Sequence, residues 1–161
     1  MGEWGKAEGT PWPLGATWVE SLRAYNFALF SRHAASVTLL LYNEHDPVNP
    51  PLHYVFDPIL NKTGLVWHCM VPEEVLRGAT LYAYRVDGPY DPSRGHRFDA
   101  HKVLLDPFAF SVCFPPRYSR SSASEPGPSD GVTPLWIPAL QAPMILRRPA
   151  KDILFQASII W

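Results

Sequence analysis

Hydrophobic positions recur along the chain in short runs that alternate between two faces, and turn-forming residues separate the runs. In residues 80–86 (TLYAYRV), Tyr82 and Tyr84 share one face, and most positions are aromatic or β-branched. This pattern is typical of a β-strand. The strand is predicted to end at residues 87–89 (DGP), because glycine tolerates positive φ and proline supplies no N–H to a ladder. A rigid loop flanked by aromatic residues should follow, with a second break at residues 93–95 (SRG).

Four other segments have the length and composition of strands: residues 26–31 (NFALFS), 36–42 (SVTLLLY), 52–56 (LHYVF) and 65–71 (LVWHCMV). The first two lie close together in the sequence, which favours two antiparallel neighbours. Prolines in residues 44–51 exclude a central strand there, so the third segment is predicted to be a short edge strand. The fourth is apolar on both faces, which indicates a strand inside a sandwich.

The segments between and beyond these strands are short or irregular. Residues 1–24 contain three tryptophans without helical spacing and are predicted to form an extended lead-in that packs its aromatic side chains onto a sheet. Residues 72–78 (PEEVLRG) have the proline, early acids and closing glycine of one helical turn. Residues 115–149 contain eight prolines, and this Pro/Ser/Gly-rich composition predicts a linker or irregular surface segment. Residues 152–161 are apolar enough to form a last strand.

Short strands at intervals of about ten residues predict an all-β fold, an immunoglobulin-like β-sandwich, which needs about 100 residues. The 161 residues, 47% of them hydrophobic and 18% charged, suit one domain or two small ones. The 18 prolines and 10 glycines favour short segments over long helices. Residues 12–110 have the size of such a sandwich, and residues 119–161 are regarded as an irregular Pro/Ser-rich C-terminal tail.

Charge and cysteine content narrow the function classes. A formal net charge of -1 offers no clustered positive surface for nucleic acid. Cys69 and Cys113 have no metal-ligand spacing, and two cysteines are too few for a secreted disulfide scaffold, which favours a reduced intracellular protein. The N-terminus lacks the apolar core of a signal peptide, and no run approaches the ~18 apolar residues of a membrane span. The sequence thus predicts a cytoplasmic protein, or a plastid one if a transit peptide has been removed, with no membrane partner.

Six stretches of the chain form an ordered set with constant spacing: PLGAT (13–17), NFALFS (26–31), VTLLLY (37–42), TGLVWH (63–68), YRVDGPYDPSRGHRF (84–98) and KVLLDPFA (102–109). Together they resemble the N-terminal domain of isoamylase-type glycogen or starch debranching enzymes. That domain is a family-48 carbohydrate-binding module of the early-set type, and it precedes the (β/α)₈ barrel of glycoside hydrolase family 13. The resemblance covers about residues 11–118.

The resemblance implies a partner of α-glucan type (glycogen, starch or maltodextrin) and a parent enzyme that hydrolyses α-1,6 branch linkages. Retaining hydrolysis requires two carboxyl groups ~5 Å apart, and in this family they come from barrel strands. A barrel needs at least ~200 residues, whereas about 40 follow the module here, so no catalytic residue, metal or cofactor is expected in this chain. Residues 152–157 loosely resemble the first barrel strand, and a fragment, a truncated gene product or a divergent tail would explain the ending equally well.

The chain departs from glycan-binding relatives, which stack glucose on tryptophans and use a lysine in the strand before the VDG turn. Here that strand offers YAY (residues 82–84), and the loop after Tyr42 (NEHDP) offers no tryptophan. Tyr90, just past the turn, is therefore the candidate residue for stacking on sugar. Trp67 and Tyr84 alternate within apolar strands, which favours a place in the core over sugar contact.

The other chemically notable side chains are assigned structural roles. Asp87 and Asp91 precede a glycine and a proline, so they are predicted to form turns and not a catalytic pair. Arginines and a lysine near them are expected to pair with aspartates or to form a docking surface, namely Arg85, Arg94, Arg97 and Lys102. Three histidines lack the spacing of a zinc site, namely His68, His96 and His101.

Two alternatives to the debranching-enzyme module stay open. The chain would also fit a stand-alone glycogen-binding or interaction module without enzyme activity. A third hypothesis is a docking subunit that pairs with a full-length debranching homologue.

Overall fold

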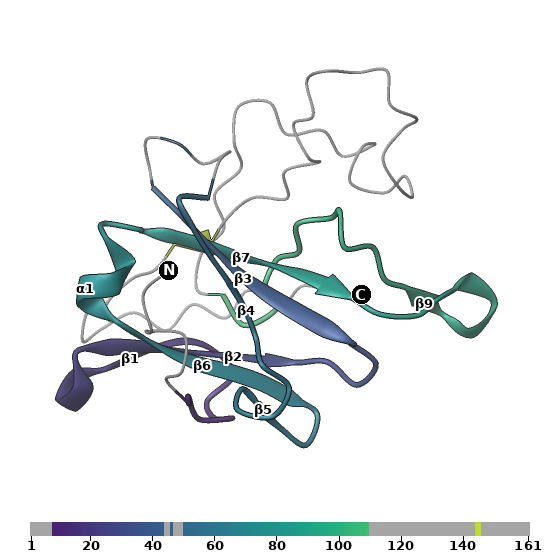
Figure 1. Cartoon of the computed structure of the whole chain (residues 1–161), viewed down its shortest axis with the longest axis horizontal. Coiled ribbons are helices and arrows are strands. Elements are labelled where there is room, and N and C mark those ends of the chain that lie inside the picture. The colour runs from purple at the N-terminus through teal and green to yellow at the C-terminus, as the bar shows by residue number, and fades with distance from the viewer. Residues whose placement is uncertain (1–7, 44–45, 47–49, 110–143, 146–161) are drawn as a thin grey trace.

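The computed structural model describes residues 8–43, 46, 50–109 and 144–145, and two four-stranded antiparallel sheets stack face to face in it (Figure 1). Sheet A has the spatial order β1 (Gly15–Val19), β2 (Ala24–Phe30), β6 (Val66–Pro72) and β5 (Lys62–Thr63). Sheet B has the order β10 (Met144–Ile145), β7 (Leu81–Asp87), β3 (Ser36–Tyr42) and β4 (Leu52–Val55). A separate hairpin consists of β8 (Tyr90–Asp91) and β9 (His96–Arg97). Helical structure in the described residues is limited to α1 (Glu73–Leu76) and two 3-10 turns, η2 (Glu20–Leu22) and η3 (Pro92–Arg94).

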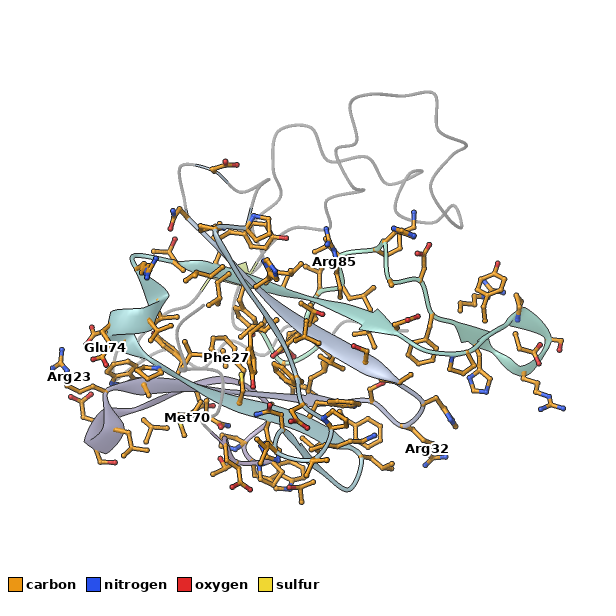
Figure 2. The ribbon with its side chains drawn as sticks, in the orientation of Figure 1. Arg23, Phe27, Arg32, Met70, Glu74 and Arg85 are labelled. Carbon is orange, nitrogen blue, oxygen red and sulfur yellow. The ribbon has the colours of Figure 1, made fainter. Side chains whose placement is uncertain are left out.

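The hydrophobic core lies between the two sheets and takes every second residue of their central strands. Phe27 of β2, Leu39 of β3 and Trp67 of β6 are almost fully buried, and Figure 2 shows Phe27 in the space between the sheets. Its ring meets the ring of Tyr82 edge to face, with centroids 5.3 Å apart. Interdigitation of two inner faces in this way is the packing of a β-sandwich, which confirms the predicted all-β fold.

Most predicted elements are present with boundaries close to those expected. Strand β3 occupies the predicted residues 36–42, and β2, β6 and β7 begin and end within two residues of their predicted limits. Strand β4 lies at the edge of sheet B, as the flanking prolines indicated. The helical turn α1 also falls inside the predicted segment. No helix in the described part of the chain is long and apolar enough to cross a membrane.

The prediction that residues 26–31 and 36–42 are neighbouring strands is wrong. Strand β2 pairs with β1 and β6, whereas β3 pairs with β4 and β7. Residues 31–35 therefore carry the chain from one sheet to the other. The inward residues of both strands pack into the same core from opposite sheets, among them Phe27 of β2 and Leu39 of β3.

The N-terminal lead-in is only partly what the sequence suggested. Residues 15–19 form β1, and Trp18 packs against Tyr25 with ring centroids 5.0 Å apart, as expected. Trp12 is 68% exposed, so the prediction that it packs onto a sheet is wrong. Two prolines flank Trp12 and keep its segment out of the hydrogen-bonded ladder. Trp4 lies outside the described residues.

Residues 8–10 cross the outer face of sheet A and are held there by a buried asparagine. The Asn26 side chain accepts a hydrogen bond from the Thr10 N–H (2.7 Å) and donates one to the Thr10 carbonyl (2.9 Å). A Cβ at Gly9 would lie 2.6 Å from the backbone carbonyl carbon of Cys69, so only glycine allows this approach. Residues 8–10 thereby direct the chain toward Trp12 and the start of β1.

Of the predicted tail, the structure describes only two residues. Met144 and Ile145 form β10, opposite Tyr82 and Leu81 of β7. The other residues of segment 119–161, including the possible last strand, lie outside the described residues, as does Cys113.

Candidate functional site

The segment after β7, which the sequence predicted to be a rigid loop flanked by aromatic residues, forms a small hairpin (Figure 1). Strand β8 pairs with β9, which places Tyr90 opposite Arg97. The turn η3 connects them and ends at Gly95, whose φ of 81° favours glycine. Tyr90 is 58% exposed, so its ring is available to a ligand.

The two aspartates of this region shape the backbone, as predicted. One carboxylate oxygen of Asp87 accepts the N–H of Gly88 at 2.8 Å. A carboxylate oxygen of Asp91 accepts the N–H of Ser93 at 3.2 Å and also its hydroxyl proton. Mainly because of the hydroxyl hydrogen bond, the pKa of Asp91 lies below its ordinary value. Arg94 adds an ion pair to Asp91 at 3.6 Å, which agrees with the expected pairing of basic and acidic side chains.

Position 88 requires glycine because there is no room for a side chain. The prediction that glycine is needed there for a positive φ is wrong. The glycines with positive φ in the described residues do not include it. A Cβ at this position would lie 2.8 Å from Cγ of Phe98 and 2.9 Å from the carbonyl oxygen of His33. The turn therefore packs directly against two distant segments, and this contact fixes where the hairpin carrying Tyr90 begins.

The face of sheet B that points away from sheet A is not an open sugar platform. Its apolar residues form one cluster that is almost fully buried: Leu40, Tyr42, Leu81, Ala83 and Val103. Burial raises the pKa of the Tyr42 phenol to about 12, against a smaller opposing effect of Arg85. Arg85 lies on the same face (Figure 2). Ala83 stands in the strand where glycan-binding relatives were expected to carry a lysine.

Trp67 and Tyr84 belong to the core, as the alternation of their strands predicted. They are 1% and 0% exposed. The ammonium group of Lys62 lies 4.4 Å from the centroid of the Trp67 ring and covers that side chain further. Neither ring is accessible to a sugar in this structure.

Residues 103–109, called the closing segment below, follow the hairpin and complete the sandwich. Leu104 exchanges two backbone hydrogen bonds with Tyr84, at 3.0 and 2.7 Å. The buried carboxylate of Asp106 then accepts the Tyr82 hydroxyl (3.0 Å) and the Phe108 N–H (2.9 Å). Burial raises the pKa of Asp106 to about 6, although these two hydrogen bonds oppose the rise.

Sequence reasoning did not identify the buried polar side chains of Asn26, Asn61 and Asp106. Asn26 carried a detectable signal, since it is a polar residue inside an otherwise apolar run. Asn61 is also fully buried and accepts the Tyr54 hydroxyl at 2.7 Å. Buried side chains of this kind need partners, and only the folded chain shows which partners they have.

We expect the two core tyrosines to respond differently to loss of the hydroxyl group. Tyr82→Phe should lower the free energy of unfolding by about 1–2 kcal/mol, because it removes a hydrogen bond to a buried carboxylate. Tyr84→Phe should change it by less than about 0.5 kcal/mol, since the Tyr84 hydroxyl is buried without a hydrogen-bond partner among the described residues. Urea unfolding of both variants measures the difference, and equal losses would contradict this account.

The histidines do not gather into a metal centre in the described residues, where no group of three or more His, Cys, Asp or Glu side chains is arranged to hold an ion. His68 instead lies 2.9 Å from the Thr63 hydroxyl through Nε2. Burial lowers the pKa of His68, while nearby Glu8 acts in the opposite direction. His33 and His96 stack edge to face, with centroids 4.5 Å apart.

Comparison with known families accounts for the sandwich from β1 to residue 109, that is, for all its strands in the described residues except β10. The family model of carbohydrate-binding module 48, the isoamylase N-terminal domain, matches residues 13–109. The chain belongs to this family. The match begins just before β1 and ends at the last residue of the closing segment. The matched residues, 13–109, are called the family-48 module below, and they include the core between the two sheets.

The family-48 module is similar in sequence to part of several curated enzymes. Over 108 residues it is 44% identical to isoamylase 3, chloroplastic, of Oryza sativa subsp. japonica, covering 64% of this chain and 13% of that protein. Over 101 residues it is 43% identical to the glycogen debranching enzyme of Yersinia pseudotuberculosis serotype IB, covering 63% and 14%. Isoamylase 1, chloroplastic, of the same rice is 35% identical over 158 residues, covering 90% of this chain and 18% of the enzyme. The chain thus spans less than one fifth of these relatives.

Solved structures share the fold of the family-48 module. The pullulanase SAP of Group B Streptococcus, in complex with maltotetraose, superposes with a TM-score of 0.55 at 15% sequence identity, covering 86% of this chain and 15% of that one. The same pullulanase in a second crystal structure gives a TM-score of 0.54. At this identity the likeness establishes the fold alone.

Proposed function

We propose that this chain is the N-terminal, α-glucan-associated module of a glycogen or starch debranching α-1,6-glucosidase and is not catalytic alone. The observation that carries the proposal is the family match over residues 13–109, in a chain whose relatives are named isoamylases and glycogen debranching enzymes. We propose residues 11–118 as the module and residues 119–161 as the connection to a catalytic barrel. The similarity to rice isoamylase 1 supports this division, because it covers 90% of this chain and therefore extends beyond the proposed module into the segment that follows it.

The arrangement of the acids supports a non-catalytic role. A retaining glycosidase needs two carboxyl groups about 5 Å apart that face an open sugar site. Asp87 and Asp91 are engaged in turns of the hairpin region, and Asp106 is buried within the closing segment. We assign hydrolysis to the barrel of the parent or of a homologous enzyme.

Incubation of the purified chain with glycogen, amylopectin and maltoheptaose tests this assignment. Reducing ends should not increase, whereas calorimetry should detect binding of α-glucan. Release of linear chains from branch points would overturn the non-catalytic role. Absence of binding to all three glucans would overturn the association with α-glucan.

Within this function we propose Tyr90 as a sugar-stacking residue. Its ring is exposed on a short hairpin, and aromatic faces bind the apolar C–H faces of glucose. Tyr90→Ala should weaken glycogen binding about tenfold, equivalent to about 1.4 kcal/mol. Co-sedimentation with glycogen measures the change. Leu22→Ala is the matched control, because Leu22 is 61% exposed and lies on η2 beside sheet A. Equal binding by the Tyr90→Ala variant and the wild type would reject the site.

The alternative is that the chain is a docking module or subunit. The apolar residues on the outer face of sheet B are buried and offer no contact surface to a sugar. A pull-down with a full-length debranching enzyme distinguishes this alternative from a free glucan binder. The names of the relatives include chloroplastic proteins, and we propose a cytoplasmic or plastid location, which cell fractionation tests.

A further inference from the structure

The N-terminal PLGAT stretch and the closing LLDPFA stretch, about 90 residues apart in the sequence, meet at one edge of the sandwich. The contact is close, since a Cβ at Gly15 would lie 3.1 Å from both Cβ and the carbonyl oxygen of Phe108. Gly15 has a φ of 94°, so glycine is required there for conformation as well as for space. The juxtaposition brings Phe108 close to the segment that contains Trp12.

Both of these segments expose a large aromatic side chain. Trp12 is 68% exposed and Phe108 is 53% exposed. Trp12 precedes Gly15 by three residues, which span at most about 10 Å of extended chain. The backbone of Trp12 therefore lies near the segment that carries Phe108, and neither of the two rings belongs to the core cluster between the sheets.

The backbone that carries each ring is fixed. Phe108 donates its N–H to the buried carboxylate of Asp106 at 2.9 Å, and the next residue, Ala109, donates to the Asp106 carbonyl at 3.1 Å. On the other side, the Trp12 carbonyl accepts the Thr10 hydroxyl at 2.8 Å, and Thr10 is clamped by Asn26. Rigid backbone with exposed rings reduces the ordering cost of binding.

The chemistry around the rings favours a neutral ligand. Residues 9–19 and 107–109 contain no charged side chain. A phosphorylated or acidic ligand would therefore find no counter-charge within these segments, whereas an uncharged glucan presents C–H faces that stack on aromatic rings. The apolar residues on the outer face of sheet B, by contrast, are buried.

We propose that Trp12 and Phe108 form a second aromatic site, separate from Tyr90, which binds a neutral α-glucan chain where the start of β1 meets the closing segment. The site rests on the proposed function, because it specifies where the α-glucan binds. It places sugar contact next to the point at which the chain leaves the module, on the side of sheet A.

Affinity electrophoresis in gels that contain glycogen, together with calorimetry with maltoheptaose, tests the site on the full chain. Trp12→Ala and Phe108→Ala should each weaken binding about five- to tenfold, and the double variant about fifty-fold. Phe108→Tyr keeps the ring and should bind like the wild type, as should the Leu22→Ala control. Thermal unfolding shows whether each variant is folded, and the exposed position of Trp12 makes Trp12→Ala informative even if Phe108→Ala is unstable.

The outcomes separate this site from the proposed function. If the wild type binds and Tyr90→Ala weakens binding while the Trp12 and Phe108 variants do not, this inference is rejected and the proposed function stands. If the wild type binds no glucan, both are rejected. If the Trp12 and Phe108 variants keep glucan binding but lose association with a full-length debranching enzyme, the surface is a protein-docking site and the inference is again rejected.

Discussion

Replacement of Trp67 with alanine should lower the free energy of unfolding by about 3–5 kcal/mol, the range for a large aromatic residue deleted from a core. Trp67 is 1% exposed between the sheets and belongs to the cluster that both sheets share. The variant loses apolar burial and leaves a cavity that the rigid strands around it cannot fill. It also removes the ring over which the Lys62 ammonium lies. Urea unfolding followed by far-ultraviolet circular dichroism measures the loss without depending on tryptophan fluorescence.

Trp12→Ala is the matched control for this prediction, because it makes the same chemical change at an exposed position. The free energy of unfolding should then change by less than about 0.5 kcal/mol. The two substitutions should also separate by function, with stability affected at Trp67 and glucan binding affected at Trp12. If Trp67→Ala were as stable as Trp12→Ala but bound less glycogen, Trp67 would be a surface residue and the core assignment would be wrong.

The second large effect should come from Asp106, as a loss of stability with rising pH. Burial raises the pKa of Asp106 to about 6, against an ordinary aspartate value of about 3.9 in the unfolded chain. The native state therefore binds the proton more tightly. Its contribution is fully present below about pH 4 and is lost as pH rises through about 6. A difference of about two pKa units corresponds to about 3 kcal/mol.

Asp106→Asn isolates this contribution. The amide can still accept the Phe108 N–H through its oxygen and can donate to the Tyr82 hydroxyl oxygen, yet it does not ionise. The free energy of unfolding of the wild type should fall by up to about 3 kcal/mol relative to this variant between pH 4 and pH 7. Urea titrations at several pH values provide the comparison.

The comparison with Asp106→Asn is needed because another buried group acts in the opposite direction. Burial lowers the pKa of His68, so its contribution is present above the ordinary histidine value and is lost as pH falls. Both proteins contain His68, and its effect cancels in their difference. The same pH dependence in wild type and variant would show that Asp106 does not ionise in its buried position.

Several features of this protein follow from local sequence patterns. Residues 36–42 and 80–86 alternate apolar faces with period two, and this periodicity alone located β3 and β7 to within a residue. Asp87 and Asp91 were assigned to turns because their neighbours are glycine and proline, and their carboxylates do accept nearby N–H groups. The ordered motifs indicated the family, which the match over residues 13–109 establishes.

Tertiary contacts decided what local patterns left open. Two apolar strands that follow each other can pair within one sheet or face each other across a core, and their sequences do not distinguish the two arrangements. In the folded chain β2 pairs with β1 and β6, and β3 pairs with β4 and β7, so the two strands belong to different sheets. The environment of Asp106 also depends on residues far away in the chain, since Tyr82 lies 24 positions before it. Its buried carboxyl group could not be anticipated from neighbouring cations.

The sequence by itself determined the strands, the turn chemistry and the family, because these depend on the order of residues over short distances and on motif spacing. Only the tertiary structure showed that the rings of Trp12 and Phe108 are accessible. Trp67 and Tyr84 are covered because two sheets close over them, whereas Trp12 and Phe108 are exposed at an edge where two distant segments meet. Exposure of a side chain depends on everything packed around it. For this reason Trp12 and Phe108 emerged from the fold, whereas Tyr90 was predicted from its place just past a turn.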